Sequence, residues 1–261
     1  QIPARHGILG PLIRSIFIPE KDHEWGIFDY SQQEPRLVVH YASLRHFTGA
    51  GKFVDSYQED ETTDFHTMVS EMADIPRKQA KTINLGLFYG MGKGKLMSQL
   101  GVNLETASEL LASYNERVPF VKQLMNDTMN KAGKKGYLST LEGRRCRFDQ
   151  WEPTNEWGQK SLPLAEAQQQ YGEHMIKRAW TYKALNRLIQ GSAADQTKKA
   201  MLELDKEGYL AHIQVHDELD FSVASDADKT KIKDIMENCV ELSVPSKVDV
   251  ECGDNWGDAG D

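Results

Sequence analysis

A four-residue spacing of chemically distinct side chains marks residues 75–90. Two cations, one apolar residue and one phenol share this spacing: Arg77, Lys81, Leu85 and Tyr89. Because an α-helix has about 3.6 residues per turn, the four side chains lie along one helix face. Pro76 suits a first helical turn, and Gly90 with Gly92 ends the pattern. The spacing predicts an amphipathic helix with a cationic end and an aromatic end.

Two segments with strand patterns flank this helix in the sequence. Residues 25–29 are a short apolar run that ends in Asp29, which is typical of a buried strand with a carboxylate at its tip. Residues 212–223 alternate apolar and polar positions on both sides of His216-Asp217-Glu218. That alternation predicts a β-hairpin whose acidic residues lie at or near the bend.

The remaining patterns give a coarse order of elements. Pro35 fits the start of a helix over residues 36–43. Helical periodicity covers residues 104–118 and 120–132, is interrupted by Pro119, and stops at Gly133 and Gly136. Residues 140–148 indicate a basic loop or hairpin. We expect strands and a helix to about residue 45, a mainly helical middle to about residue 190, then helix, hairpin, helix and a terminal strand.

Composition limits the class of protein. A chain of 261 residues can bury a substantial core, as one large or two smaller domains. No window reaches the roughly 18 apolar residues of a membrane span, and no signal-peptide pattern begins the chain. Three cysteines with no close pair argue against a disulfide framework and for a reducing compartment, so we expect a cytoplasmic protein without a membrane partner.

The net charge of −8 counts against a nucleic-acid binder, because phosphate contacts usually come from a basic surface. Positive charge is nevertheless concentrated locally, in residues 77–81, 131–135 and 143–147. Acids are also what a metal-dependent site requires. The overall charge therefore does not exclude DNA as a partner.

Asp29 and Asp217, each at the end of a predicted strand, could together hold divalent cations. Two metal ions about 3.5–4 Å apart can activate an attacking oxygen and stabilise a leaving one in phosphoryl transfer. Mg²⁺ suits such a site because it prefers oxygen ligands and retains waters and substrate phosphates. Taken singly, these aspartates could be turn or cap residues, and the basic helix could be an ordinary solvated face. Together they favour a site for nucleotidyl transfer.

Three motifs in order resemble the A, B and C motifs of the family A DNA polymerases, the group of bacterial polymerase I and phage replicative enzymes. They are Asp-Tyr-Ser-Gln-x-Glu at residues 29–34, Arg-x-x-x-Lys-x-x-x-(apolar)-x-x-x-Tyr-Gly at 77–90 and Gln-Val-His-Asp-Glu at 214–218. Residues 1–5, 140–145, 190–195 and 255–257 also fit the family pattern. The resemblance therefore spans nearly the whole chain.

The resemblance implies roles for individual residues. Asp29, Asp217 and the backbone carbonyl of Tyr30 would hold two Mg²⁺ ions, with Mn²⁺ as a substitute, and Glu218 would support them. The nucleotide-binding residues would be Arg77, Lys81, Leu85, Tyr89, Glu34, Gln32 and His66. Among these, Lys81 is also a candidate proton donor, and Glu34 would pair with Tyr89 and exclude a ribose 2′-hydroxyl. Primer–template contacts would come from Arg5, Asn186, Gln190 and His216.

Some of these roles have ordinary structural alternatives. His66 could simply cap a helix, and Asn186 and Gln190 could be surface amides on one helix face. The chain also departs from the family pattern. Leu85 stands where many relatives carry an aromatic residue, Tyr182 stands where bacterial members often have arginine, and the stretch 146–182 is longer than in bacterial relatives. These departures suggest a bacteriophage or other viral lineage, with a bacterial host cytoplasm as the compartment.

The fold implied by the resemblance is α+β: a right-hand polymerase palm, with an antiparallel sheet and helices, into which mainly helical fingers are inserted. Residues 1–45 and 183–261 would form the palm, and residues 46–182 the fingers. No thumb is expected within this stretch. Because Gln1 falls just inside a family motif, we expect a thumb and an exonuclease-like region before it, as partners of this portion.

The implied function is template-directed DNA synthesis from deoxynucleoside triphosphates on a primer–template. Two alternatives remain. A single-subunit RNA polymerase shares the palm acids and a Lys-to-Tyr helix, although Glu34 argues against it. A non-catalytic primer–template binding remnant would keep the fold without chemistry, although the retained aspartates argue against that interpretation.

Overall fold

A computed structural model describes residues 6–156 and 158–259 of the chain. The chain forms two compact units, residues 1–36 with 193–261 and residues 37–192, so the first unit is discontinuous in sequence. Helices α2 (Gln33–Ser43) and α10 (Ala184–Lys206) run from one unit into the other. The units therefore divide inside two helices, whereas the sequence placed the boundaries after α2 and just before α10. The assignment of the units as palm and fingers stays a prediction.

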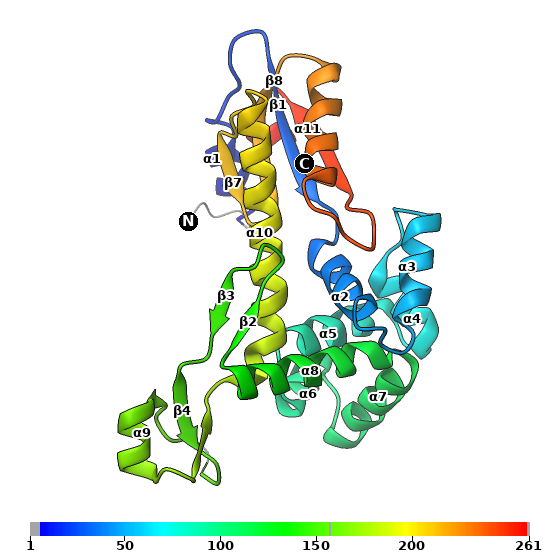
Figure 1. Cartoon of the computed structure of the whole chain (residues 1–261). Helices are drawn as coiled ribbons and strands as arrows, with labels where there is room; N and C mark the ends of the chain where they lie inside the picture. The colour runs from blue at the N-terminus through cyan, green and yellow to red at the C-terminus, as the bar shows by residue number, and fades with distance from the viewer. Residues whose placement is uncertain (1–5, 157, 260–261) are drawn as a thin grey trace. The chain divides into compact units, whose positions relative to one another are not determined.

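The first unit is built on a four-stranded antiparallel sheet (Figure 1). Its strand order is β7-β8-β1-β9. The strands are β1 (Glu24–Tyr30), β7 (Ile213–Val215), β8 (Glu218–Val223) and β9 (Val248–Gly253). The helices that accompany them are α1 (Leu9–Arg14), α11 (Asp226–Asn238) and α12 (Trp256–Ala259). The hairpin expected at residues 212–223 is confirmed as β7 and β8, and the strand expected at 25–29 as β1.

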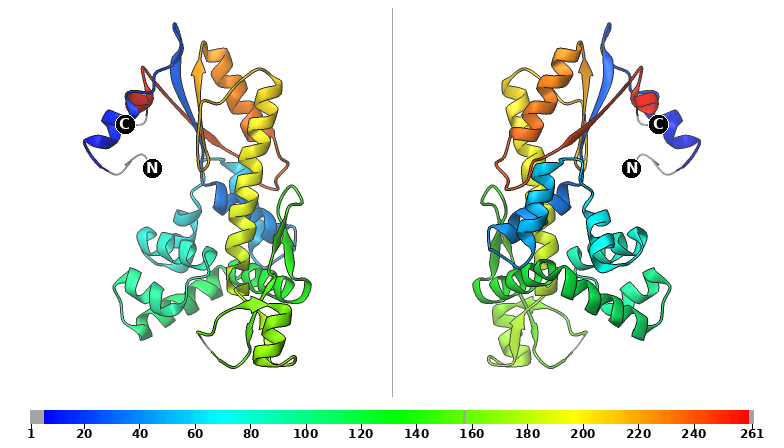
Figure 2. Two further views of the ribbon diagram at one scale, coloured as in Figure 1. Left: turned by 90° about the vertical axis from the view of Figure 1, so that its left-hand side faces the viewer. Right: turned by 90° about the vertical axis from the view of Figure 1, so that its right-hand side faces the viewer.

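Apolar side chains cover both faces of this sheet. On one face Phe28, Leu219 and Phe221 pack against Ala200 and Leu204 of α10 and against α11. On the other face, Trp25 and Ile27 pack with Trp256 of α12. Figure 2 shows α11 on one side of the sheet and α1 with α12 on the other. Because side chains alternate along a strand, burial on both faces fixes the register of the central strand β1.

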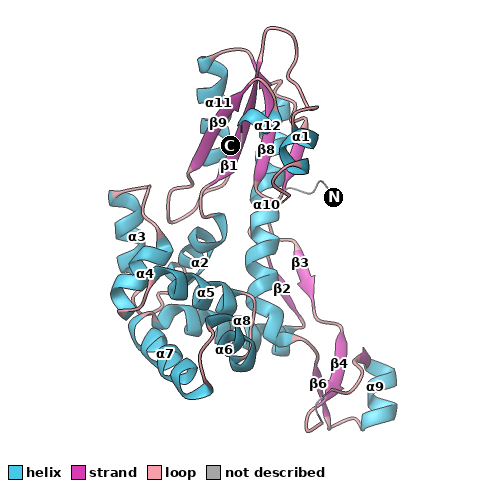
Figure 3. Ribbon diagram, turned by 180° about the vertical axis from the view of Figure 1, so that it is seen from behind, coloured by secondary structure: helices cyan, strands magenta, loops and turns pink. Residues whose placement is uncertain are grey.

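The second unit is mainly helical (Figure 3). Its helices are α3 (Ala50–Glu59), α4 (Phe65–Ala73), α5 (Arg77–Phe88), α6 (Lys93–Leu100), α7 (Leu104–Arg117), α8 (Pro119–Lys135) and α9 (Leu164–Tyr171). Phe53, Phe65, Phe88 and Phe120 are fully buried, and their rings contact one another at centroid distances of 5.0–6.4 Å. This aromatic cluster joins α3, α4, α5 and α8 into one core.

Two small sheets follow α8. Where a basic loop or hairpin was expected at residues 140–148, the structure has a β-hairpin of β2 (Tyr137–Ser139) and β3 (Arg145–Arg147), whose first strand lies before the expected range. The longer stretch expected at 146–182 contains a three-stranded sheet of order β5-β4-β6 beside α9, which lies apart from α3–α7 in Figure 3. Its strands are β4 (Gln150–Pro153), β5 (Leu162–Pro163) and β6 (Ile176–Arg178), and the 3₁₀-helix η1 (Thr181–Lys183) leads into α10.

Some expected helix ends were wrong. Helix α2 begins at Gln33, so Pro35 lies in its first turn and does not precede a later start. Gly133 lies inside α8, which continues to Lys135 and ends at Gly136, a residue with φ of 76°. Gly136 adopts this left-handed conformation without the strain that a Cβ would impose, whereas an interior glycine only weakens a helix.

Two findings bear on the class of protein to which the chain can belong. Among the described residues, none of the helices combines the length and the apolarity that a membrane crossing requires. The three cysteines, Cys146, Cys239 and Cys252, are free thiols.

Gly90 provides a test of how α5 ends. Its φ is 67°, and a Cβ at this position would lie 2.4 Å from the backbone carbonyl oxygen of Tyr182. We expect Gly90→Ala to lower the free energy of unfolding by about 2 kcal/mol or more, because left-handed strain and a backbone clash add. The matched control is Gly92→Ala, since Gly92 has φ of −74° and a Cβ placed there would meet no atom within 4 Å. Urea denaturation of both variants measures the difference, and equal stabilities would contradict this account of the helix end.

Candidate active site

Asp29 lies in the central strand of the first unit, one residue before the strand ends. Its cross-strand partners are Glu218 on β8 and Asp249 on β9. The side chain of Asp29 is on the same sheet face as Trp25 and Ile27, because side chains two residues apart share a face. Register therefore gathers three acids across neighbouring strands.

Asp217 joins this group from the turn between β7 and β8. His216 has φ of 56°, and the Gln214 side-chain amide donates to the His216 carbonyl oxygen at 2.6 Å, which shapes the turn. The Tyr30 N–H donates to the Asp217 carbonyl oxygen at 3.4 Å, so the turn is tied to the end of β1. The Tyr30 hydroxyl donates to the Met236 carbonyl oxygen at 2.7 Å, which anchors this residue on the α11 side.

The surroundings of this cluster destabilise the negative charges of its carboxylates. Burial, followed by the charge of Asp217 and then of Glu218, raises the pKa of Asp29 from 3.8 to about 7. Burial also raises the pKa values of Asp217 and Glu218. Within residues 6–156 and 158–259, no ion pair with Lys, Arg or His offsets Asp29, whereas Asp249 pairs with Lys247. The cluster is therefore short of positive charge.

That donor set fits divalent cations bound by few protein ligands. No group of three or more His, Cys, Asp or Glu side chains arranged to hold a metal occurs in the described part of the chain. Mg²⁺ commonly binds through one or two carboxylates and completes its shell with waters and substrate phosphates. Asp29 and Asp217 supply two carboxylates, and a bound cation would offset both the burial and the repulsion that raise the pKa of Asp29.

Glu34 and Gln32 follow directly on β1. Gln32 has φ of 53°, and its carbonyl oxygen accepts from the Arg36 N–H at 3.1 Å, which turns the chain into α2. Glu34 is the acid in the first turn of α2 and is half-buried. The predicted pairing of Glu34 with Tyr89 would join the two units, and it stays a prediction.

In the second unit, α5 has the two faces that its spacing predicted. The four-spaced residues are on the open side: Arg77 and Lys81 are exposed, Leu85 is half-buried and Tyr89 is 40% exposed. The opposite side, with Ala80, Ile83, Asn84 and Phe88, is fully buried. Packing therefore orients the cationic and aromatic side chains outward, where a ligand could reach them.

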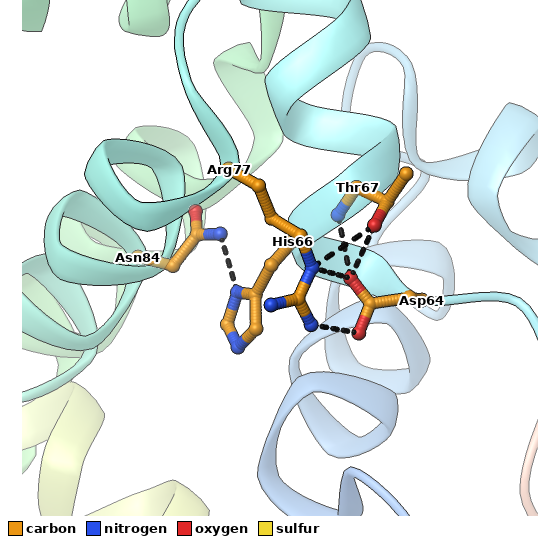
Figure 4. A network of polar contacts seen from close by, with 5 residues as sticks. All are labelled: Asp64, His66, Thr67, Arg77 and Asn84. Atoms are coloured by element: carbon orange, nitrogen blue, oxygen red, sulfur yellow. Dashed lines mark hydrogen bonds and ion pairs between the residues drawn. The ribbon is translucent and has the colours of Figure 1, made fainter.

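A carboxylate from α4 already contacts one of these cations (Figure 4). Arg77 donates from Nε and Nη2 to Asp64 at 3.2 and 2.8 Å. Asp64 is also the N-cap of α4 and accepts from the Thr67 N–H at 2.6 Å. Although partial burial acts to raise it, the hydrogen bonds from Arg77 and Thr67 lower the pKa of Asp64. The α4 cap thus holds Arg77 beside the start of α5.

His66 is the second residue of α4 and is only 6% exposed. The cap of this helix is Asp64, so the alternative that His66 acts as a helix cap is wrong. Its Nδ1 lies 2.8 Å from the side-chain amide nitrogen of Asn84 on α5 (Figure 4). Burial lowers the pKa of His66 to about 4. The imidazole is therefore neutral near pH 7.

The predicted primer–template residues occupy several places. Asn186 and Gln190 lie on α10, where Asn186 is half-buried and Gln190 is exposed. His216 is exposed in the β7–β8 turn. Arg5 lies outside the described residues. Their roles stay predictions.

Sequence reasoning did not single out Asn84, Tyr114 or Asp220, which the structure places around the site residues. Asn84 and Tyr114 are fully buried behind α5, and Asp220 is fully buried in β8. Burial, followed by the charge of Glu218, raises the pKa of Asp220 to about 8. A signal was present in the sequence, since Asn84 interrupts the apolar side of the helix and Asp220 stands between Leu219 and Phe221.

Comparison with known proteins agrees with this arrangement. Residues 1–258 match the sequence profile of DNA polymerase family A. The chain is 38% identical to the DNA-directed DNA polymerase of Pseudomonas phage M6, across 98% of this chain and 41% of that protein. It is 33% identical to DNA polymerase I of Bacillus subtilis (strain 168), across 96% of this chain and 28% of that protein.

A solved structure is similar along the whole chain. It is the POL domain of Pol1 from M. smegmatis in complex with DNA primer-template and dNTP, with a TM-score of 0.77 and 29% identity. The match covers 100% of this chain and 45% of that one. The chain thus spans less than half the length of each of these three proteins.

The raised pKa of Asp29 gives a pH-dependent prediction. Between the ordinary pKa of 3.8 and the folded-state pKa of about 7, the folded protein holds a proton that the unfolded chain releases. The contribution of Asp29 to the free energy of unfolding is therefore fully present below about pH 4 and is lost as pH rises through about 7. We expect the Tm of the metal-free protein to fall over this window, and to fall less in Asp29→Asn.

Magnesium should act in the opposite direction. Because it binds the deprotonated carboxylate, Mg²⁺ should raise the Tm of the wild type more at about pH 8 than at about pH 6. Differential scanning calorimetry with Mg²⁺ or with EDTA measures both effects. An Mg²⁺ effect independent of pH, or equal in Asp29→Asn, would contradict the assignment of the acid.

Proposed function

Because the chain belongs to DNA polymerase family A, we propose that it carries the site at which a polymerase adds deoxynucleotides to the 3′ end of a DNA primer. The observation that carries the proposal is the cluster of Asp29 and Asp217 at the end of the central sheet, with charge that its surroundings leave uncompensated. Such a pair of carboxylates can bind the metal ions that support phosphoryl transfer.

In this proposal Asp29, Asp217 and the backbone carbonyl of Tyr30 hold two Mg²⁺ ions, and Glu218 supports them. When bound, the ions activate the primer 3′-hydroxyl for attack on the α-phosphate and stabilise the departing pyrophosphate. Trp256 donates from Nε1 to Glu218 at 3.3 Å, so the supporting carboxylate is held toward the α12 side of the sheet. The strand register keeps Asp29 and Glu218 opposite each other.

The exposed face of α5 is the proposed nucleotide-binding surface. Arg77 and Lys81, with His66 and Gln32, contact the triphosphate, and Lys81 gives a proton to the leaving pyrophosphate. Leu85 contacts the sugar and base, and Tyr89 lies beside the templating position. A flat phenol and two cations on one helix face match the apolar and anionic ends of a nucleotide.

A basic region of the second unit supports DNA as the partner. Residues 131–147 contain six Lys or Arg residues and one acid, and residues 176–187 contain four and none. These segments contact one another through α8, β2, β3, β6 and η1. Arg145 stacks on Tyr137 and Arg187 on Phe148, each at 4.7 Å, which holds the guanidinium groups in place. Clustered cations of this kind neutralise phosphates despite a net charge of −8.

The metal ligands give the direct mutational test. We expect Asp29→Asn and Asp217→Asn each to abolish primer extension, because each removes a charged ligand while changing little volume. Both variants should fold, and Asp29→Asn should be at least as stable as the wild type because it removes a buried repulsive charge. Primer extension and thermal melting are measured together, with Asp205→Asn on the exposed end of α10 as the matched control. Near-normal extension by either variant would remove that residue from catalysis.

Sugar selection separates DNA synthesis from RNA synthesis. We expect Glu34→Ala to admit ribonucleotides more readily, because the carboxylate would no longer occupy the space of the 2′-hydroxyl. The measurement is the ratio of kcat/KM for a deoxynucleotide and the matching ribonucleotide, in wild type and variant. If the wild type prefers ribonucleotides, the RNA polymerase alternative holds; if the ratio does not change in the variant, Glu34 does not select the sugar.

A further inference from the structure

Three polar side chains form a buried chain of hydrogen bonds behind α5. They come from three helices: His66 on α4, Asn84 on α5 and Tyr114 on α7. Asn84 and Tyr114 are completely buried, and His66 is 6% exposed. The Tyr114 hydroxyl lies 2.6 Å from Asn84 Oδ1, and Asn84 Nδ2 lies 2.8 Å from His66 Nδ1. A polar chain in an otherwise apolar core is costly unless each donor finds an acceptor.

The tyrosine sets the direction of this chain. Burial raises the pKa of Tyr114, so its hydroxyl keeps its proton and requires an acceptor. The acceptor within reach is Asn84 Oδ1. With the amide turned the other way, Asn84 would donate toward the tyrosine and leave the phenolic proton without an acceptor, which is unfavourable for a buried group. The amide NH₂ of Asn84 therefore faces His66.

This direction determines the tautomer of His66. Since Asn84 donates to Nδ1, Nδ1 carries the lone pair and the single proton of the neutral ring is on Nε2. Nε2 lies on the side of the ring away from Asn84 (Figure 4). No hydrogen bond joins Nε2 to any residue that the structure describes, so this N–H is a donor that the described part of the chain does not use.

Burial, helped by the neighbouring cations, keeps the His66 ring neutral. Burial lowers the pKa of His66 most; Asp64 acts to raise it, whereas Lys81 and Arg77 lower it further. Asp64 is itself occupied by Arg77, which weakens its ability to attract a proton to His66. The ring thus offers a directed, uncharged donor beside the two cations of α5.

We propose that Asn84 and Tyr114 are positioning residues, which hold His66 as a neutral Nε2–H donor to a phosphate oxygen of the incoming nucleotide. This inference rests on the proposed function, in which His66 contacts the triphosphate. The cations Arg77 and Lys81 supply charge, and the buried chain of hydrogen bonds supplies one uncharged donor of fixed orientation. The alternative is that His66 is a satisfied core residue that no ligand touches.

The tautomer can be observed without any activity. In the purified protein labelled with ¹⁵N-histidine, the His66 signals are assigned by their loss in His66→Gln. We expect the Nε2–H tautomer, with no titration between about pH 6 and 8. Asn84→Asp should reverse the tautomer and introduce a titration, because a carboxylate accepts the Nδ1 proton. An Nδ1–H tautomer in the wild type, or a wild-type titration near the ordinary pKa of 6.5, would overturn the proposed chain.

The affinity for a deoxynucleotide tests the role of this buried chain of hydrogen bonds. With Mg²⁺ and primer–template present, we expect Tyr114→Phe to raise the Kd for a deoxynucleotide roughly threefold to tenfold, the range for one hydrogen bond. The matched control is Tyr57→Phe, which removes a hydroxyl from a fully buried tyrosine on α3. That control should leave the affinity unchanged.

The double variant separates a positioning role from a structural one. If Tyr114 acts through His66, adding Tyr114→Phe to His66→Gln should cause no further loss of affinity, whereas independent effects would multiply. Multiplying effects, or a Kd in Tyr114→Phe equal to that of the wild type, would overturn the proposal while leaving the function of Asp29 and Asp217 intact. A wild type that binds no deoxynucleotide at all would contradict the proposed function as well.

Discussion

The candidate active site depends on the register of one strand, β1, between β8 and β9. That register sets Asp29 opposite Glu218 and Asp249. The hydrogen bond from the Tyr30 N–H to the Asp217 carbonyl oxygen brings the hairpin turn to the same end of the sheet. A slip of one residue would move Asp29 to the face covered by α10 and α11. The apolar cores on both faces prevent that slip, and their packing energy also holds together carboxylates that repel one another.

In the second unit, one face of α5 packs in the core and the other face presents charged and aromatic side chains. The buried side of α5 fixes the helix against α4 and the aromatic cluster, and the exposed side presents two cations and a phenol. Asn84 lies on the buried side, and its side-chain amide nitrogen is 2.8 Å from His66 Nδ1. The acidic cluster of Asp29, Asp217 and Glu218 lies in the sheet unit, and the exposed cations Arg77 and Lys81 lie in the helical unit.

The spacing of residues in the sequence was sufficient to predict the parts of the site that lie on regular helices and strands. The face of α5, the strand that ends near Asp29 and the Asp217 hairpin all follow from periods of 3.6 and 2. The start of α2 was missed because Gln33 and Glu34 show no apolar period before Pro35. The β4–β6 sheet was missed because its strands have two to four residues. Asn84 and Tyr114 could not be paired from sequence, since their contact depends on how α5 and α7 pack.

The central claim is that Asp29 and Asp217 together hold the metal ions of a nucleotidyl-transfer site. The most direct measurement is anomalous diffraction from Mn²⁺ in crystals grown with primer–template and a non-hydrolysable deoxynucleoside triphosphate. The account predicts two Mn²⁺ peaks at the carboxylates of Asp29 and Asp217, beside the triphosphate. Ordered nucleotide with no Mn²⁺ at these carboxylates, or with Mn²⁺ held by other side chains, would contradict it.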